Sequence, residues 1–139
     1  KLAHKGTSYF TSGSIAVVDV RDVVLAMQGL MNSDLKNERY ILVGATLSYK
    51  EFTKELALAF DKNPPEKEIA EWKLLLLSSI DGLVSSLFGT KRKLQKANVK
   101  SLYTRSNYNA HKIEKALSFG FTTVSQTIKR VASDYKSEH

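Results

Sequence analysis

The chain has 139 residues, of which 42% are hydrophobic and 9% aromatic, and its formal net charge is +7. This length and composition predict one globular domain and exclude a disordered chain. Because it contains no cysteine and no uncharged apolar run of 18 residues, disulfides, thiolate metal sites and an ordinary membrane-spanning helix are excluded, and we expect a cytoplasmic protein.

Three short strands are predicted in the first third of the chain. Tyr9–Phe10 and Ile15–Val18 have the aromatic and β-branched residues that strands favour. Ser12 and Gly13 between them are typical of a turn. A third strand is expected over Tyr40–Val43.

A helix is predicted between the second and third strands. Asp19 stands at the N-cap position, where its carboxylate could accept from the backbone N–H of Asp22. Both acids lie near the positive end of the helix dipole. Apolar residues then recur with helical spacing and predict one buried face, formed by Val23, Val24, Ala26, Met27, Leu30 and Met31.

The next helix has a strong start signal. Ser48 and Glu51 have the spacing of a capping box. Pro64 and Pro65 are expected to end this helix and to force an extended connection. Its apolar stripe is predicted to contain Phe52, Leu56, Ala59 and Phe60.

Four further helices complete the prediction. The first covers Ala70–Phe88, and the second covers Leu94–Leu102. Asn109 is expected to cap a short third helix that ends at Leu117, and Ser125 to cap the last one. The result is a helix-rich α/β chain with a few short strands. The apolar face of the 70–88 helix is predicted to point inward with Trp72, Leu75, Leu76, Ile80, Leu83, Val84 and Leu87.

The positive charge is concentrated in residues 91–115. This segment has eight basic residues and one acidic residue, whereas residues 1–90 have ten basic and eleven acidic residues. A basic stretch can bind phosphate. We favour a solvated surface, or the contact face of an acidic neighbouring domain, because the segment lacks a recognisable nucleic-acid-binding module.

No catalytic or metal site is predicted. The histidines His4, His111 and His139 lie far apart in the sequence without suitably spaced ligands or triad partners. Asp19 and Asp22 are close together, but helix capping accounts for both. Tyr108 and Lys112 have the Tyr-x-x-x-Lys spacing, yet Tyr108 precedes the predicted cap Asn109, so that the two side chains would not share a helical face.

The order of these motifs resembles the C-terminal part of the extended short-chain dehydrogenase/reductase family, the NAD-dependent epimerase/dehydratases. The resemblance extends from about Tyr9 to Tyr135. It is carried by Val18–Val23, Glu38–Leu42 with Gly44, Leu47–Ser48, Tyr108–Asn109, Lys112–Leu117 and Phe119–Phe121.

The resemblance implies a substrate-binding part of an oxidoreductase that is not catalytically competent alone. The family carries its glycine-rich dinucleotide loop and its catalytic residues in an N-terminal Rossmann domain, which we expect to be absent here. NAD or NADP is therefore implied for the parent enzyme, with none bound by residues 1–139 alone. Ile15 replaces an arginine that is usual in nucleotide-sugar members, which favours the dihydroflavonol-reductase-like members.

The aromatic residues Tyr9, Phe10 and Trp72 are candidates for the walls of a substrate pocket, although such side chains more often lie in a core. The expected partners are a small-molecule substrate, the absent Rossmann domain and a second copy of the chain. Neither membrane nor nucleic acid is expected as a partner. The alternative function is a basic module that binds nucleic acid or another polyanion through residues 91–115.

Overall fold

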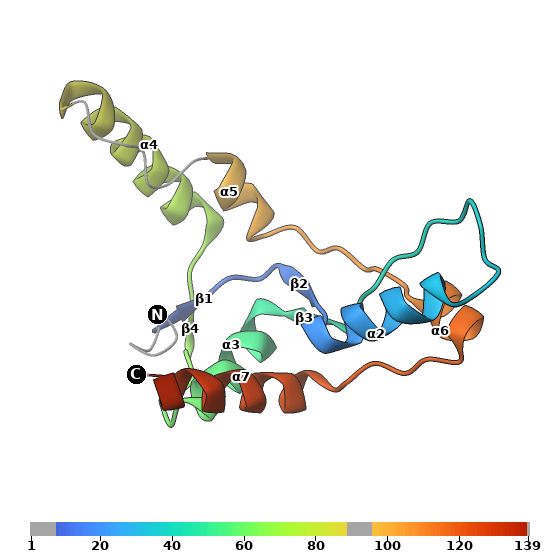
Figure 1. Cartoon of the computed structure of the whole chain (residues 1–139). Coiled ribbons are helices and arrows are strands. Elements are labelled where there is room, and N and C mark those ends of the chain that lie inside the picture. The colour runs from blue at the N-terminus through green and yellow to red at the C-terminus, as the bar shows by residue number, and fades with distance from the viewer. Residues whose placement is uncertain (1–7, 89–95, 139) are drawn as a thin grey trace. The chain divides into compact units, whose positions relative to one another are not determined.

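The computed structural model describes residues 8–88 and 96–138 (Figure 1). The chain divides into two compact units. Unit 1 comprises Lys1–Ser14 and Ser48–Arg105, and unit 2 comprises Ile15–Leu47 and Ser106–His139. Each unit is thus formed by two separate stretches of the chain. The architecture is α/β and helix-rich, as the sequence predicted.

A parallel pair of very short strands joins the two stretches of unit 1. Tyr9 pairs with Lys67 and Phe10 with Glu68, and the N–H of Ile69 donates to the carbonyl of Phe10 at 2.9 Å. The second strand was not predicted, because lysine and glutamate are poor strand formers. The elements of this unit are β1 (Tyr9–Phe10), α3 (Tyr49–Ala59), β4 (Lys67–Glu68), α4 (Glu71–Phe88) and α5 (Lys96–Ser101).

Helix α3 begins as predicted. Ser48 Oγ accepts from the N–H of Glu51 at 3.2 Å, and Glu51 Oε2 accepts from the N–H of Ser48 at 3.0 Å. These reciprocal bonds satisfy two of the N–H groups that a helix start leaves without a partner. The capping box is therefore confirmed.

Helices α4 and α5 lie against each other (Figure 1). Both predicted helices are confirmed, except that residues 89–95, with the expected start at Leu94, lie outside the described residues. The predicted orientation of α4 is wrong, because its fully buried residue is Ser78 and several side chains expected to point inward are exposed. These are Trp72, Leu76, Ile80, Leu83 and Val84.

Unit 2 contains a two-stranded sheet and three helices. Its elements are β2 (Ser14–Val17), α2 (Val20–Met31), β3 (Ala45–Ser48), α6 (His111–Leu117) and α7 (Val124–Glu138). Strands β2 and β3 pair with each other. Ser14, the first residue of β2, and Ser48, the last residue of β3, belong to unit 1. The strand predicted over 40–43 is wrong, since Tyr40 and Leu42 pack on the core and the strand begins after Gly44.

The core of unit 2 is small. Ala26 of α2 packs against Ala110 and Ile113, and Leu30 and Leu117 surround this cluster. Because α6 has only seven residues, it covers a single strip of α2. The predicted buried face of α2 is therefore only partly correct, and three of its members are exposed: Val24, Met27 and Met31.

The two acids at the start of α2 contact residues around the start of α7, far along the same chain. Asp19 caps α2 as predicted, but its Oδ1 accepts from the N–H of Arg21, at 2.9 Å, and not from that of Asp22. Asp19 also accepts two hydrogen bonds of 2.8 Å from Arg130 Nη2. Hydrogen bonding from Arg130 is the main cause that lowers the pKa of Asp19 to about 2.

Asp22 has a tertiary role that capping does not explain. Its carboxylate accepts from the N–H of Thr122 at 2.7 Å and from the hydroxyl of Thr122 at 2.8 Å. The cap predicted at Ser125 is also wrong, because α7 begins at Val124, two residues earlier than a helix capped at Ser125, and Thr123 Oγ1 accepts from the N–H of Gln126. Within residues 8–88 and 96–138, no helix is long and apolar enough to cross a membrane.

Candidate functional site

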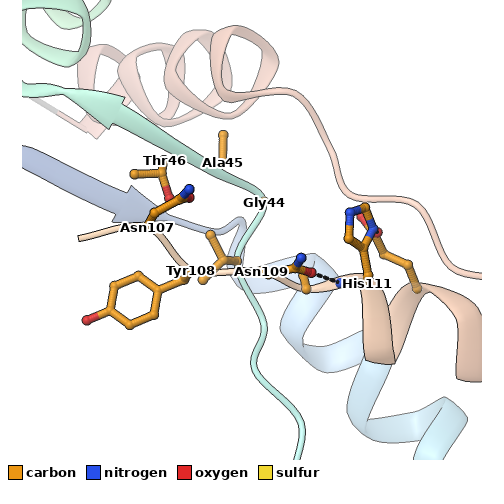
Figure 2. A pocket seen from close by; sticks show the side chains of 10 residues that line it. Gly44, Ala45, Thr46, Asn107, Tyr108, Asn109 and His111 are labelled. Atoms are coloured by element: carbon orange, nitrogen blue, oxygen red, sulfur yellow. Dashed lines mark hydrogen bonds and ion pairs between the residues drawn. The ribbon is translucent and has the colours of Figure 1, made fainter. Parts of the chain in front are cut away.

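A polar hollow of about 390 Å³ lies in unit 2, between the start of β3 and the segment that leads into α6 (Figure 2). Two stretches far apart in the sequence supply its walls. Its lining comprises Val43, Gly44, Ala45, Thr46, Asn107, Tyr108, Asn109, Ala110, His111 and Glu114.

Gly44 fixes the wall contributed by β3. Its N–H donates to the carbonyl of Val17 at 2.9 Å. A Cβ at this position would lie 3.3 Å from that carbonyl oxygen and 3.6 Å from the Cβ of Phe121. The absence of a side chain therefore allows β3 to approach the end of β2 closely, and this contact sets where Ala45 and Thr46 lie.

Asn109 fixes the opposite wall. Its Oδ1 accepts from the N–H of His111, the first residue of α6, at 2.7 Å (Figure 2). The N-cap position is Ala110, so the cap predicted at Asn109 lies one residue too early. His111 Nδ1 lies 3.1 Å from Glu114 Oε2 at the rim. Because both side chains are exposed, this contact adds little stability and leaves the rim open to solvent.

Thr46 supplies the least satisfied polar atom of the hollow. Its Oγ1 is buried and has no hydrogen-bond partner among the described residues. Buried hydroxyls are usually paired, so an unpaired one calls for an explanation. With the amides of Asn107 and Asn109 beside it, the hollow has donors and acceptors suited to hydroxyl or carbonyl groups.

Lys112 does not form a pair with Tyr108. Its ammonium group donates to Glu38 and to the carbonyl of Arg39, and it lies 5.0 Å from the ring centroid of Tyr40. The hydrogen bond to Glu38 raises the pKa of Lys112. Since Tyr108 precedes α6, the two residues share no helical face, as the sequence predicted.

The aromatic residues proposed from the sequence are distributed over unit 1. Tyr9 lines a hollow of about 460 Å³ with Asn63, Pro64 and Lys67 among others, whereas Trp72 lines one of about 630 Å³. Phe10 lies under the ammonium group of Lys50, which is 5.4 Å from its ring centroid. Tyr9 and Trp72 thus belong to different hollows, and their role in substrate binding stays a prediction.

The basic segment 91–115 is divided between the two units. Arg105 Nε donates to the carbonyl of Ser12 at 3.2 Å, and Lys112 is paired with Glu38. Part of its charge is therefore used in contacts within the chain. The described part of the chain contains no group of three His, Cys, Asp or Glu side chains that could hold a metal ion.

Sequence reasoning placed Asn109 at the start of a helix but did not predict Asn109, Thr46 or Asn107 as site residues. A cap gives a local signal, because the acceptor and the N–H that it binds are two residues apart. The cluster of polar residues in 105–109 interrupts the apolar spacing and could have indicated a surface loop with binding groups. The position of Thr46 opposite this loop depends on tertiary structure alone.

Two solved structures share this fold. The crystal structure of gox2253 matches 98% of the chain with a TM-score of 0.74 and 13% identity. The structure of RMD from Pseudomonas aeruginosa complexed with NADPH matches 99% of the chain with a TM-score of 0.58 and 16% identity. The chain spans about two fifths of the length of each, since 41% of either solved chain is covered. No protein-family model and no curated protein sequence matches it.

Proposed function

We propose that this chain is the substrate-binding portion of an NAD(P)-dependent epimerase/dehydratase or reductase of the extended short-chain dehydrogenase/reductase family. On this proposal residues 1–139 form one part of a longer enzyme, and a separate N-terminal Rossmann domain binds the dinucleotide. The parent enzyme acts on a small molecule of the kind used by dihydroflavonol-reductase-like proteins. The chain by itself is not catalytically competent.

The single observation that carries the proposal is the coverage of the structural similarity. Nearly the whole chain matches two solved structures, yet it accounts for 41% of each. One of the two was solved with NADPH. On this proposal, a chain that corresponds to about two fifths of larger proteins is a portion of a similar protein. The motif order from Val18 to Phe121 supports the same assignment independently.

The residues present do not fit a dinucleotide. Phosphate-binding loops of this class need closely spaced glycines whose backbone faces the pyrophosphate, and the sequence has no Gly-x-x-Gly-x-x-Gly. A Cβ at Gly13 would lie 2.3 Å from the carbonyl oxygen of Leu102, and one at Gly44 would lie 3.3 Å from that of Val17. Both glycines thus allow two chain segments to approach each other and do not form a phosphate cradle.

The proposed assignment of the dinucleotide to a separate Rossmann domain leads to a calorimetric prediction. Titration of the chain with NAD⁺, NADH, NADP⁺ and NADPH is expected to give no saturable heat. Binding of any of the four with a dissociation constant in the micromolar range would contradict the assignment of the cofactor to another part of the parent enzyme.

The polar hollow is the proposed contact for hydroxyl or carbonyl groups of the substrate. Thr46→Val removes the unpaired hydroxyl and keeps the shape of the side chain. We expect it to abolish saturation-transfer NMR signals from small aromatic and aliphatic ketones and alcohols that bind the wild-type chain. The folding stability should be unchanged or rise by about 1 kcal/mol, because an unsatisfied buried group is lost.

A matched control is Thr53→Val on α3. The hydroxyl of Thr53 donates to the carbonyl of Tyr49 outside the hollow, so its removal should leave ligand signals intact. Equal signals in the Thr46→Val and wild-type chains, or no signal from any compound, would exclude the hollow as the binding site.

A further inference from the structure

Helix α4 has its apolar face exposed. Trp72, Leu76, Ile80 and Leu83 fall within about 80° of one another around a helix with 100° per residue. Trp72 and Leu83 are 62% and 67% exposed, and Leu76 and Ile80 are more than half exposed. Within unit 1, the described residues leave this face uncovered. Exposed apolar surface of this extent marks an interaction site.

The opposite face of α4 is the one that is packed. Ser78 is fully buried, and Gly82 and Ser85 near it are half-buried. Helix α5 lies against α4 (Figure 1). The large side chains of α4 are therefore left for a partner outside this helix pair. The hollow of about 630 Å³ at Trp72 and Lys100 extends the apolar surface toward α5.

We propose that the partner is a second copy of this chain, bound through α4 in an antiparallel pair related by a two-fold axis. If the axis passes midway between Leu76 and Ile80, Leu76 of each copy faces Ile80 of the other. Trp72 then faces Val84, and Leu83 faces Lys73. Lys73 comes to lie beside the carboxyl-terminal half of the partner's α4. The negative end of the helix dipole lies there, so it favours a cation. The face is thus complementary to itself, as a two-fold interface requires.

The exposed area is sufficient for such a pair. Five large hydrophobic side chains on this side of α4 are between 45% and 67% exposed: Trp72, Leu76, Ile80, Leu83 and Val84. Together they offer on the order of 500 Å² per copy, so that a pair buries about 1,000 Å², the area that a specific interface should clear. An aromatic residue at the edge of such a patch is typical of the residues that dominate binding. This inference does not depend on the proposed function.

Sedimentation velocity over a range of concentrations tests the proposal. We expect a reversible monomer–dimer equilibrium in the wild-type chain. Trp72 is the only tryptophan, so its fluorescence should shift to shorter wavelength as the dimer forms. Ile80→Glu places a charge at the centre of the face and is expected to raise the dimer dissociation constant by about 100-fold.

The matched control is Leu58→Glu on α3. Leu58 is 53% exposed and Ile80 is 51% exposed, so both substitutions place a charge at an aliphatic residue of similar exposure, on α3 and on α4 respectively. The Leu58→Glu chain should dimerise like wild type. A wild-type chain that stays monomeric at all concentrations, or a dimer that Ile80→Glu leaves unchanged, would overturn the proposal. A monomer that binds phosphatidylserine vesicles through Ile80 would also overturn it, by assigning the face to lipid.

Disulfide trapping tests the antiparallel arrangement, because the natural chain contains no cysteine. Chains carrying Leu76→Cys and Ile80→Cys are mixed in equal amounts and oxidised. Random pairing would give as much mixed disulfide as the two homodimers together, and the proposal predicts that the mixed disulfide exceeds their sum. Predominant like-with-like disulfides would show a parallel pair and contradict the proposed symmetry.

Discussion

Asp19→Ala is expected to lower the free energy of unfolding by about 3 kcal/mol. Asp19 is only 3% exposed, and its loss removes the cap of α2 together with two hydrogen bonds to Arg130. A lost cap costs about 1 kcal/mol, and a broken buried ion pair costs more. Because the side chain of Arg130 is 25% exposed, it can partly regain water, which limits the loss. Urea unfolding monitored by circular dichroism measures the effect.

The matched control is Asp134→Ala, which removes the other acid near Arg130. Asp134 is an exposed acid 3.5 Å from Arg130 Nη1, and exposed pairs contribute ~0–1 kcal/mol. If Asp19→Ala were no more destabilising than Asp134→Ala, the ion pair would not hold the start of α2 to α7.

The same pair gives the stability a defined pH dependence. Its contribution is present above the unfolded pKa and disappears as pH falls through the folded pKa, because the pKa of Asp19 is lowered on folding from 3.8 to about 2. This group should therefore contribute about 2 kcal/mol above pH 4, decreasing toward pH 2. Asp19→Asn should lose less stability than wild type between these pH values. Parallel pH profiles for the two chains would contradict this assignment.

Gly13→Ala is expected to lower the free energy of unfolding by about 3 kcal/mol through a backbone clash. The new Cβ would lie 2.3 Å from the carbonyl oxygen of Leu102 and 2.9 Å from that of Thr104. Relief of the clash requires the strand segment to move, which breaks the 3.1 Å bond from the Gly13 N–H to Leu102. Thermal unfolding provides the measurement.

Gly120→Ala is the control for this substitution. A Cβ at Gly120 would meet nothing within 4 Å. We expect its midpoint to stay close to that of wild type. Equal effects at the two glycines would mean that the loss of glycine flexibility, and not the contact with Leu102, determines the result.

Helix starts could be predicted from the sequence because their signals are local. Asp19, Ser48 and Asn109 each bind an N–H two or three residues further along the chain. The contact of Asp19 with Arg130 spans 111 residues, and no short pattern identifies such a partner. The same limit applies to the candidate site, where Asn109 was expected only as a helix cap and the facing Thr46 was not singled out.

Periodicity identified which residues share a face of a helix, but it could not tell whether that face is covered. On α4 the spacing correctly grouped Trp72, Leu76 and Ile80, and the structure leaves them exposed. Strand β4 shows the opposite limit. Its two residues have low strand propensity and become a strand only because β1 supplies the hydrogen bonds.

The two units are interleaved along the chain, and this has a consequence for biosynthesis. The chain passes between them after Ser14, Leu47 and Arg105, so neither unit corresponds to a continuous stretch of the sequence. During translation, Asp19 emerges long before Arg130, so the ion pair that ties the start of α2 to α7 forms only after the C-terminal helix has been made. A ribosome-bound chain that ends before Arg130 should therefore expose the start of α2 to proteases and chaperones.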